Sequence, residues 1–247
     1  VAEGLGAKTA VIPLVLEPQP HVPPHAGRSG LALVGGFQHP PNVDAVLHFV
    51  ADAWPKVHAR LPHQTLHIIG SDMPDCIRDL SAPGVIVEGY VQDLDKNLDK
   101  RIATVAPLRY GAGIKGKIGT SLAAGLPCVA SPIAVEGMRL KDPQEILVAE
   151  TAEAYAAQLA VLVEDPSTWH LMSKNGLAHV TQTYAPEAAA ERLTTLFART
   201  GVSPFQGQCP FHGELAERLI QVRDSSERVL ANALARLTGT PETPVTD

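Results

Sequence analysis

The stretch that decides the fold is residues 106–132, APLRYGAGIKGKIGTSLAAGLPCVASP. Its apolar start predicts a buried strand that ends near Leu108, and Leu126 to Ala130 predict a second buried strand. Between them lie a glycine-rich turn and a short helix that ends around Ala124, with Gly125 as its C-terminal stop. A strand, a loop, a helix and a second strand form a βαβ unit, so the stretch predicts a parallel α/β sheet.

The glycine-rich turn has the features of an anion site. Its glycines leave backbone N–H groups accessible, the helix start adds partial positive charge, and two lysines add ammonium groups at the same end. These residues are Gly111, Gly113, Lys115, Gly116 and Lys117. The pattern predicts that a phosphate or diphosphate binds there. The alternative is a tight structural turn with solvated lysines.

Other reaction classes are disfavoured. Gly111 to Lys117 fits the start of a P-loop, G-x-x-x-x-G-K, but the next residue, Ile118, has no hydroxyl to hold magnesium. No G-x-S-x-G nucleophile elbow occurs, and Gly-Gly-Phe-Gln-His-Pro follows the first predicted strand in place of a dinucleotide fingerprint. Cys209 and His212 form one zinc-ligand pair without a second, so no metal site is expected.

Apolar runs elsewhere predict the rest of the sheet. Together with the two strands above, they give about six strands that alternate with helical patterns. This alternation predicts a Rossmann-like parallel sheet with helices on both faces. The predicted strands are Leu31 to Gly35, Thr65 to Ile69, Val85 to Val87, Ile102 to Leu108, Leu126 to Ala130 and Ile146 to Val148.

Several helix ends are also predicted. Asn42 is expected to cap the first helix, Pro55 to kink or restart it, and Asp93 to cap a later short helix. From Glu153 onward the pattern is helical, with Pro166 and Pro186 at helix N-termini. An amphipathic stripe predicts a last helix from Glu214 to Leu237, followed by a flexible tail.

Two ordered motifs resemble a known family. The run from Ala106 to Met138 resembles the nucleotide-sugar-binding segment of family 4 glycosyltransferases, which have the GT-B fold. LVGGFQHPPNVDAV at residues 33–46 is similar to the first strand and loop of that family's C-terminal domain. The resemblance covers about residues 30–200. It implies the donor-binding domain of a glycosyltransferase that retains anomeric configuration and requires no metal.

The chain also departs from the family. Many members carry two glutamates eight positions apart, and Ala112 and Thr120 stand there in this chain. The arginine and lysine of the first loop are likewise absent, with Gly36 and Asn42 at about those positions. Two hypotheses therefore remain: an active donor-binding domain, and a catalytically lapsed GT-B domain that acts as a nucleotide-binding or interaction module. The family motifs speak against another GT-B enzyme, such as an epimerase.

The candidate site residues follow from strand ends, which converge on one crevice in a parallel sheet, and from the resemblance. Lys115 and Lys117 would stabilise the growing charge of a diphosphate leaving group. Glu136 is either an acceptor for sugar or ribose hydroxyls or a solvated glutamate, and Arg109 either reaches a phosphate or pairs with a carboxylate. The other candidate contacts with the nucleotide sugar are Gly35, Gly36, Gly89, Tyr90, Gly111, Ala112, Gly113, Ile114 and Thr120. The nucleoside-diphosphate sugar, such as a UDP- or GDP-sugar, is the donor substrate, and no cofactor is expected.

The expected organisation is an interdomain linker at residues 1–28, the donor-binding domain at 29–200, and a C-terminal helix and tail at 201–247. The opening resembles the crossing between the two domains of a GT-B enzyme, so the chain is expected to be a fragment that binds donor without transferring sugar. A carbohydrate or glycolipid acceptor would bind through the missing N-terminal domain, in polysaccharide biosynthesis. A peripheral membrane contact of the full-length protein is left open.

Composition describes an ordinary globular protein. Apolar residues make up 45% and charged residues 19%, and the net charge of −6 argues against a nucleic-acid surface. No signal peptide or membrane-length apolar run is visible. Three widely spaced cysteines fit a reducing cytoplasm, with Cys128 as a buried core thiol. His58, His63 and His67 are interpreted as surface histidines.

Overall fold

The computed structural model describes residue 11 and residues 14–200. The chain divides into two compact units, of which the larger is Pro18–His179. The other unit comprises Val1–Glu17 and Val180–Asp247, and only its residues 11, 14–17 and 180–200 are described. The predicted helix from Glu214 to Leu237 and the tail lie outside the described residues.

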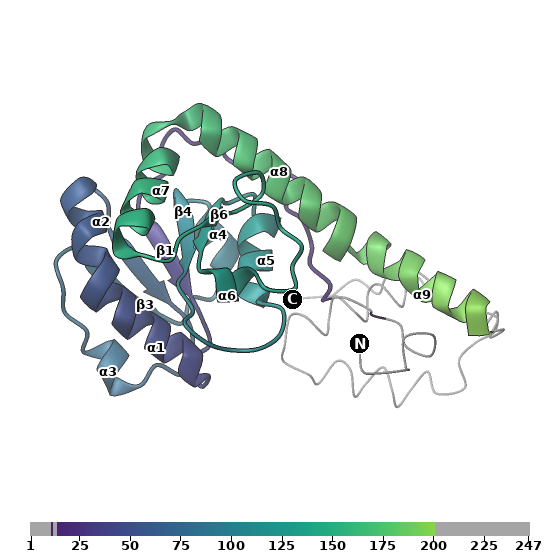
Figure 1. The fold of residues 1–247 in the computed structure, drawn as a ribbon, viewed down its shortest axis with the longest axis horizontal. Coiled ribbons are helices and arrows are strands. Elements are labelled where there is room, and N and C mark those ends of the chain that lie inside the picture. The colour runs from purple at the N-terminus through teal and green to yellow at the C-terminus, as the bar shows by residue number, and fades with distance from the viewer. Residues whose placement is uncertain (1–10, 12–13, 201–247) are drawn as a thin grey trace. The chain divides into compact units, whose positions relative to one another are not determined.

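The larger unit contains a six-stranded, all-parallel sheet in the order β3-β2-β1-β4-β5-β6 (Figure 1). Each predicted strand is present, with its ends within two residues of the expected ones. The order reverses between β1 and β4, and ligands of open α/β sheets bind at such a switch point, outside the carboxyl ends of the strands. The strands are β1 (Leu31–Val34), β2 (Leu66–Ile69), β3 (Val85–Gly89), β4 (Ala103–Ala106), β5 (Cys128–Ala130) and β6 (Leu147–Val148).

Helices lie on both faces of this sheet, as Figure 1 shows. One face carries α1 (Pro40–His48), the π-helical turn η1 (Phe49–Ala53), α2 (Trp54–Arg60) and α3 (Asp75–Arg78). The other carries α4 (Leu94–Leu98), α5 (Gly116–Ala123) and α6 (Pro132–Val135). After β6 the chain continues as α7 (Ala152–Glu164), which packs against η1 and α2. The predicted α/β class with helices on both faces is confirmed.

Two long helices end the described part of the chain. They are α8 (Pro166–Tyr184), which contributes residues to both units, and α9 (Pro186–Thr200). Both begin at the proline that the sequence predicted. Since none of the described helices is long and apolar enough to cross a bilayer, the described residues hold no candidate membrane span.

Helix ends were predicted well, with one exception. Asp93 accepts a hydrogen bond from the Lys96 N–H as the N-cap of α4, and Gly125 (φ +64°) ends α5. The predicted cap at Asn42 is wrong, because α1 already begins at Pro40 and Pro41, which suit the first turn of a helix. The break predicted at Pro55 is confirmed: α1 passes into the π-helical η1, and α2 restarts at Trp54.

Two of the predictions about buried and surface residues can be tested. Cys128 is completely buried, as expected, and burial raises the pKa of its thiol to about 12. Of the three histidines interpreted as surface residues, His63 is exposed and His58 is partly exposed, but His67 is buried, so the interpretation is wrong for His67. Its ring is stabilised inside the fold because Glu88 and Arg101 bond to its two nitrogens.

Candidate functional site

Two polar contacts join α1 to the glycine-rich segment at the switch point. Lys117 Nζ donates a hydrogen bond to Asn42 Oδ1 at 2.5 Å. Two positions further along α1, Asp44 receives two hydrogen bonds from the Arg109 guanidinium, at 2.9 and 2.6 Å. The structure thereby brings two of the predicted phosphate ligands, Lys117 and Arg109, to one stretch of α1.

Among the predicted phosphate ligands, Lys117 is the one best able to bind an anion, because its hydrogen-bond partner is neutral. Burial lowers its pKa to about 8; the Lys115 charge also lowers it, and Cys128 opposes the shift. Its ammonium group has three protons, and among the described residues only the neutral oxygen of Asn42 accepts one. The Asn42 side chain is fixed in turn, because its Nδ2 donates to the Gly36 carbonyl at 2.7 Å. A phosphate bound here would place negative charge next to the Lys117 ammonium group, which the neutral Asn42 amide does not provide.

Lys115 has a different environment from the one expected. Its Nζ donates to two carbonyl oxygens of its own loop, Gly111 O at 3.1 Å and Gly113 O at 2.6 Å, and only 9% of the residue is exposed. The alternative of a solvated lysine is therefore wrong for Lys115. Both glycines have positive φ, +126° and +78°, which favours glycine and lets the loop close around the ammonium group. Lys115 fixes the shape of the loop.

The start of α5 adds backbone donors to this place. Its N-cap residue, Lys115, contributes no side-chain hydrogen bond, so the first N–H groups of the helix are left for another acceptor. Gly116 and Lys117 begin the helix, with the Lys117 ammonium group on the same turn. Backbone N–H groups and an ammonium group therefore point to the same end of α5, as an anion requires.

Arg109 pairs with the carboxylate of Asp44, which is the second of the two roles that the sequence left open for it. The hydrogen bond and charge of Arg109 hold the pKa of Asp44 below its usual range, against a small opposing effect of burial. Because the Arg109 side chain is half exposed, the pair is open to solvent and to an incoming anion.

The remaining predicted residues divide into three groups. Gly35 and Gly36 contact Asn42, next to Lys117. Gly89 and Tyr90 line a separate open pocket of about 450 Å³ at the carboxyl ends of β2 and β3, together with Gly70 and Arg78.

The third group lies on loops and on α5. Ala112, Gly113 and Ile114 are exposed on the glycine-rich loop, and Thr120 is partly exposed on α5. Glu136 is exposed where α6 ends, and it makes no hydrogen bond or ion pair with the lysine site in the part of the chain that the structure describes. The structure therefore leaves Glu136 outside the cluster of Asn42, Arg109 and Lys117.

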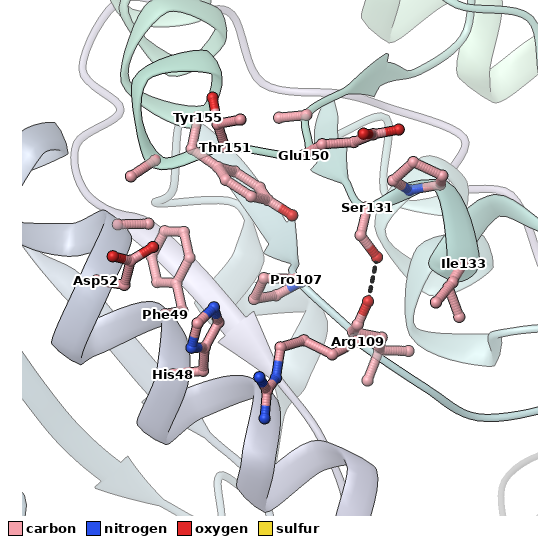
Figure 2. Close-up of a pocket in the computed structure, with 15 residues that line it drawn as sticks. His48, Phe49, Asp52, Pro107, Arg109, Ser131, Ile133, Glu150, Thr151 and Tyr155 are labelled. Atoms are coloured by element: carbon pink, nitrogen blue, oxygen red, sulfur yellow. Dashed lines mark hydrogen bonds between the residues drawn. The ribbon is translucent and has the colours of Figure 1, made fainter.

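The sequence did not reveal a second pocket at the same edge of the sheet, shown in Figure 2. It has a volume of about 350 Å³ and lies between α1, η1 and α7, next to the loops that follow β4, β5 and β6. His48, Asp52, Arg109, Glu150 and Tyr155 are among its lining residues. These residues come from three separate segments of the sequence and match no motif, so the sequence gave no sign that the segments meet in a pocket.

The comparisons with known proteins bear on the family of the chain. No curated protein matches the chain. The family model described as glycosyl transferases group 1 matches residues 28–165, more than half of the chain. The resemblance noted in the sequence is thereby confirmed.

Solved structures show the fold. The C-terminal domain of the glycosyl transferase group 1 protein LpcC from Francisella tularensis is 16% identical, with a TM-score of 0.55, over 69% of this chain and 96% of that one. Sucrose-phosphate synthase from Thermosynechococcus elongatus is 19% identical, with a TM-score of 0.61, over 78% and 53%. A mutant of S. aureus TarM, solved with fondaparinux, alpha-GlcNAc-glycerol and UDP, is 15% identical, with a TM-score of 0.60, over 74% and 37%.

The shares of chain covered indicate which part of the fold is present. This chain spans 37% of the TarM chain and 53% of sucrose-phosphate synthase, but it matches nearly the whole LpcC domain. The strand order and the switch-point loops are those of one half of a GT-B fold, the C-terminal half. The chain belongs to the glycosyl transferases of group 1.

Proposed function

We propose that this domain binds the nucleoside-diphosphate sugar of a retaining glycosyltransferase, with the diphosphate at the switch point between β1 and β4. The observation that carries the proposal is the ammonium group of Lys117, which is largely buried there with one neutral partner. A diphosphate in this place would accept hydrogen bonds from Lys117 Nζ and from the first N–H groups of α5.

The same arrangement supports a role in the reaction. Negative charge grows on the diphosphate as the glycosidic bond breaks, and donors held in position before the reaction stabilise that charge. Lys117 would act directly on the phosphate oxygens. Lys115 would act through the loop, since its own ammonium group is engaged with Gly111 and Gly113. Retention of configuration is carried over from the family.

The nucleoside would lie on the β2–β3 side of the diphosphate. The open pocket there has backbone at Gly70 and Gly89 and the ring of Tyr90, which is 74% exposed. An exposed aromatic ring at the rim of a pocket offers a stacking surface for a base. The transferred sugar would go to an unknown carbohydrate or glycolipid acceptor.

The alternative is a lapsed domain that binds nucleotide or a protein partner without taking part in transfer. Ala112 and Thr120, where many relatives have glutamates, favour this alternative. Because GT-B sites lie between two domains, the purified chain should not transfer sugar in either case, and failure to bind any nucleotide or nucleotide sugar would support the lapsed domain.

Calorimetric titration of the full chain with UDP, GDP and ADP tests the proposal. Lys117→Ala should weaken binding of the preferred nucleotide about 10- to 100-fold, since a hydrogen bond to a charged group contributes roughly 1.5–3 kcal/mol. The double variant Lys115→Ala/Lys117→Ala should lose about two orders of magnitude, and higher salt should weaken binding to the wild type.

Lys174→Ala is the matched control. It removes the same charge from an exposed position of α8 and should leave the dissociation constant unchanged. If Lys117→Ala keeps both the wild-type dissociation constant and the wild-type melting temperature, the phosphate site lies elsewhere and the glycine-rich loop is only a turn.

A further inference from the structure

Arg109 ties the glycine-rich segment, residues 109–117, to α1 through an ion pair. Its Nε and Nη2 donate to the two carboxylate oxygens of Asp44, at 2.9 and 2.6 Å. Figure 2 shows the Arg109 side chain extending from the loop after β4 toward the helix that carries His48. Two parallel hydrogen bonds fix both the position and the direction of a guanidinium group. Arg109 is therefore directed at Asp44.

The glycine-rich segment lies along the first turns of α1. Asn42 and Asp44, which both receive a cation of the segment, are about 3 Å apart along the helix axis at 1.5 Å per residue. Asn42 is buried and Asp44 is partly exposed, so the two cations meet the inner and the outer side of the same turn. The contacts are Gly111 beside Pro41, Lys117 with Asn42, and Arg109 with Asp44.

The partners of these two cations differ in charge. Lys117 bonds to a neutral amide oxygen, whereas Arg109 bonds to a carboxylate. Among the described residues, neither Lys115 nor Lys117 forms a salt bridge, so Arg109 is the one cation of the segment that a carboxylate holds. An anion that reaches the segment can bind Lys117 directly, but it has to compete with Asp44 for Arg109.

Asp44 is charged when it competes. The hydrogen bond from Arg109 is the main cause that lowers the pKa of Asp44, the charges of Arg109 and His48 lower it further, and burial opposes the shift. The carboxylate is therefore ionised near neutral pH. It keeps Arg109 paired under the conditions in which a nucleotide would bind.

The pair can nevertheless be broken at little cost. The Arg109 side chain is 51% exposed and the Asp44 side chain is 23% exposed, so solvent screens their attraction. A diphosphate carries more negative charge than one carboxylate, and its oxygens accept the same two-pronged contact from a guanidinium. A diphosphate bound at Lys117 is therefore a stronger partner for Arg109 than Asp44 is.

We propose that Asp44 is an inhibitory carboxylate of the donor site, which holds Arg109 until a diphosphate takes its place. On binding, Arg109 gives up its two hydrogen bonds to Asp44 and donates to phosphate oxygens, and no covalent bond changes. When the nucleotide leaves, Asp44 takes the guanidinium back. The pair thus lowers the affinity for the donor and favours release of the nucleotide. The inference rests on the proposed function, since it assumes that the diphosphate lies at Lys117.

Calorimetric titration of the full chain with UDP, GDP and ADP tests the inference. Asp44→Asn should bind the preferred nucleotide about two- to fivefold more tightly than the wild type, because a partly exposed ion pair no longer has to be broken. Glu164→Gln is the matched control: it makes the same change of charge in the exposed Arg60–Glu164 pair and should leave the dissociation constant unchanged. Both variants should keep the wild-type melting temperature.

A double-mutant cycle separates competition for Arg109 from simple repulsion of the ligand by Asp44. Arg109→Met should weaken nucleotide binding. In that background Asp44→Asn should tighten binding by a smaller factor than in the wild type, because no ion pair remains to be broken. An equal factor in both backgrounds would show that Asp44 acts only through its charge, and would overturn the inference.

The Nε–H signal of Arg109 in nuclear magnetic resonance spectra reports the exchange directly. The loss of the signal in Arg109→Met identifies it, and it should shift when the preferred nucleotide is added to the wild type. A signal that does not move, or an unchanged dissociation constant in folded Asp44→Asn, overturns the inference, while nucleotide binding by the wild type still supports the proposed function. Absence of nucleotide binding in both the wild type and Asp44→Asn overturns both.

Discussion

Arg28 and Lys117 are two cations that are largely buried in the fold, and their hydrogen-bond partners differ. The Arg28 guanidinium donates to the carbonyls of Pro23, Pro24, Leu98 and Arg101 at 2.9–3.2 Å and lies over the Trp169 ring. Lys117 has one hydrogen bond, to a neutral amide oxygen. Arg28 is saturated by acceptors from the protein itself, and Lys117 is not.

This contrast separates a structural cation from one available to a ligand. A buried donor that is fully bonded contributes to stability, and an anion could reach it only by breaking those bonds. A cation with unused protons at the mouth of a crevice costs stability until an anion arrives. Substitution of Arg28 should therefore act on folding, and substitution of Lys117 on binding.

The largest effect is expected for Arg28→Met. Methionine keeps the apolar stem but removes all the donors and the guanidinium over the Trp169 ring, so several buried carbonyls lose their partners. The free energy of unfolding should fall by roughly 3 kcal/mol or more, since each orphaned buried group costs about 1–3 kcal/mol. Urea denaturation measures the loss, and nucleotide affinity of the folded fraction should be unchanged.

Arg60→Met is the matched control for this experiment. Arg60 also bonds to oxygen acceptors, but its partner is Glu164 and both side chains are about half exposed, so solvent screens the pair. Its denaturation midpoint should equal that of the wild type. A midpoint for Arg28→Met as high as that of Arg60→Met would show that saturation by carbonyls does not stabilise the fold.

The second-largest effect is a pH dependence of nucleotide binding, which tests whether Lys117 is the cation that binds the ligand. The pKa of Lys117 is about 8 in the free protein, and a bound phosphate should raise it, because it stabilises the charged form. Binding is then linked to proton uptake above pH 8. Nucleotide affinity should be constant from pH 7 to just below 8 and should fall above it, by at most about tenfold per pH unit, which equals about 1.4 kcal/mol.

Calorimetry from pH 7 to 9.5 measures this dependence. Lys117→Arg serves as control, because a guanidinium stays charged throughout that range. Its affinity should not fall with pH, whatever its absolute value. A parallel fall in the wild type and in Lys117→Arg would assign the pH dependence to another group.

The difference between local and non-local information explains what the sequence predicted. Strand β1 is a continuous apolar run between two glycines, and β2 is apolar except for His67 and ends before Gly70, so neighbouring residues were enough to predict both strands. The glycine-rich loop is likewise local, and its role as a candidate anion site is recognisable from its glycines and lysines alone.

Partners of polar side chains are not local and could not be predicted. Lys117 bonds to Asn42 and Arg109 to Asp44, pairs that lie 75 and 65 positions apart in the sequence. Asn42 was interpreted as a helix cap from its neighbours, whereas two prolines and a distant lysine decide its role. Tyr155 lies in a stretch that the sequence predicted only to be helical, and only the fold shows that it lines a pocket and buries its hydroxyl.

Another buried cation, Arg101, extends the comparison. It donates to Glu88 Oε1 at 2.7 Å, to His67 Nε2 at 2.9 Å and to Asn97 Oδ1 at 3.2 Å. His67 donates through Nδ1 to the same Glu88 oxygen. These partners assign the neutral Nδ1–H tautomer to His67, because Nε2 must accept from Arg101. Arg101, like Arg28, donates several hydrogen bonds to acceptors of the protein itself, but one of those acceptors can be protonated.

The smallest expected effect follows from that acceptor. Burial lowers the pKa of His67, the Arg101 charge lowers it further, and Glu88 offsets part of the shift. The unfolded chain takes up a proton near pH 6.5, whereas the folded protein resists protonation. The contribution of His67 to stability is therefore fully present above pH 6.5 and is lost as the pH falls below it, with a slope of at most about 1.4 kcal/mol per pH unit.

Urea denaturation of the wild type and of His67→Asn at pH 7.5, 6.5 and 5.5 measures this contribution: the wild type should lose more stability than the variant over this range. Equal losses would mean that His67 can be protonated inside the fold without breaking its bond to Arg101.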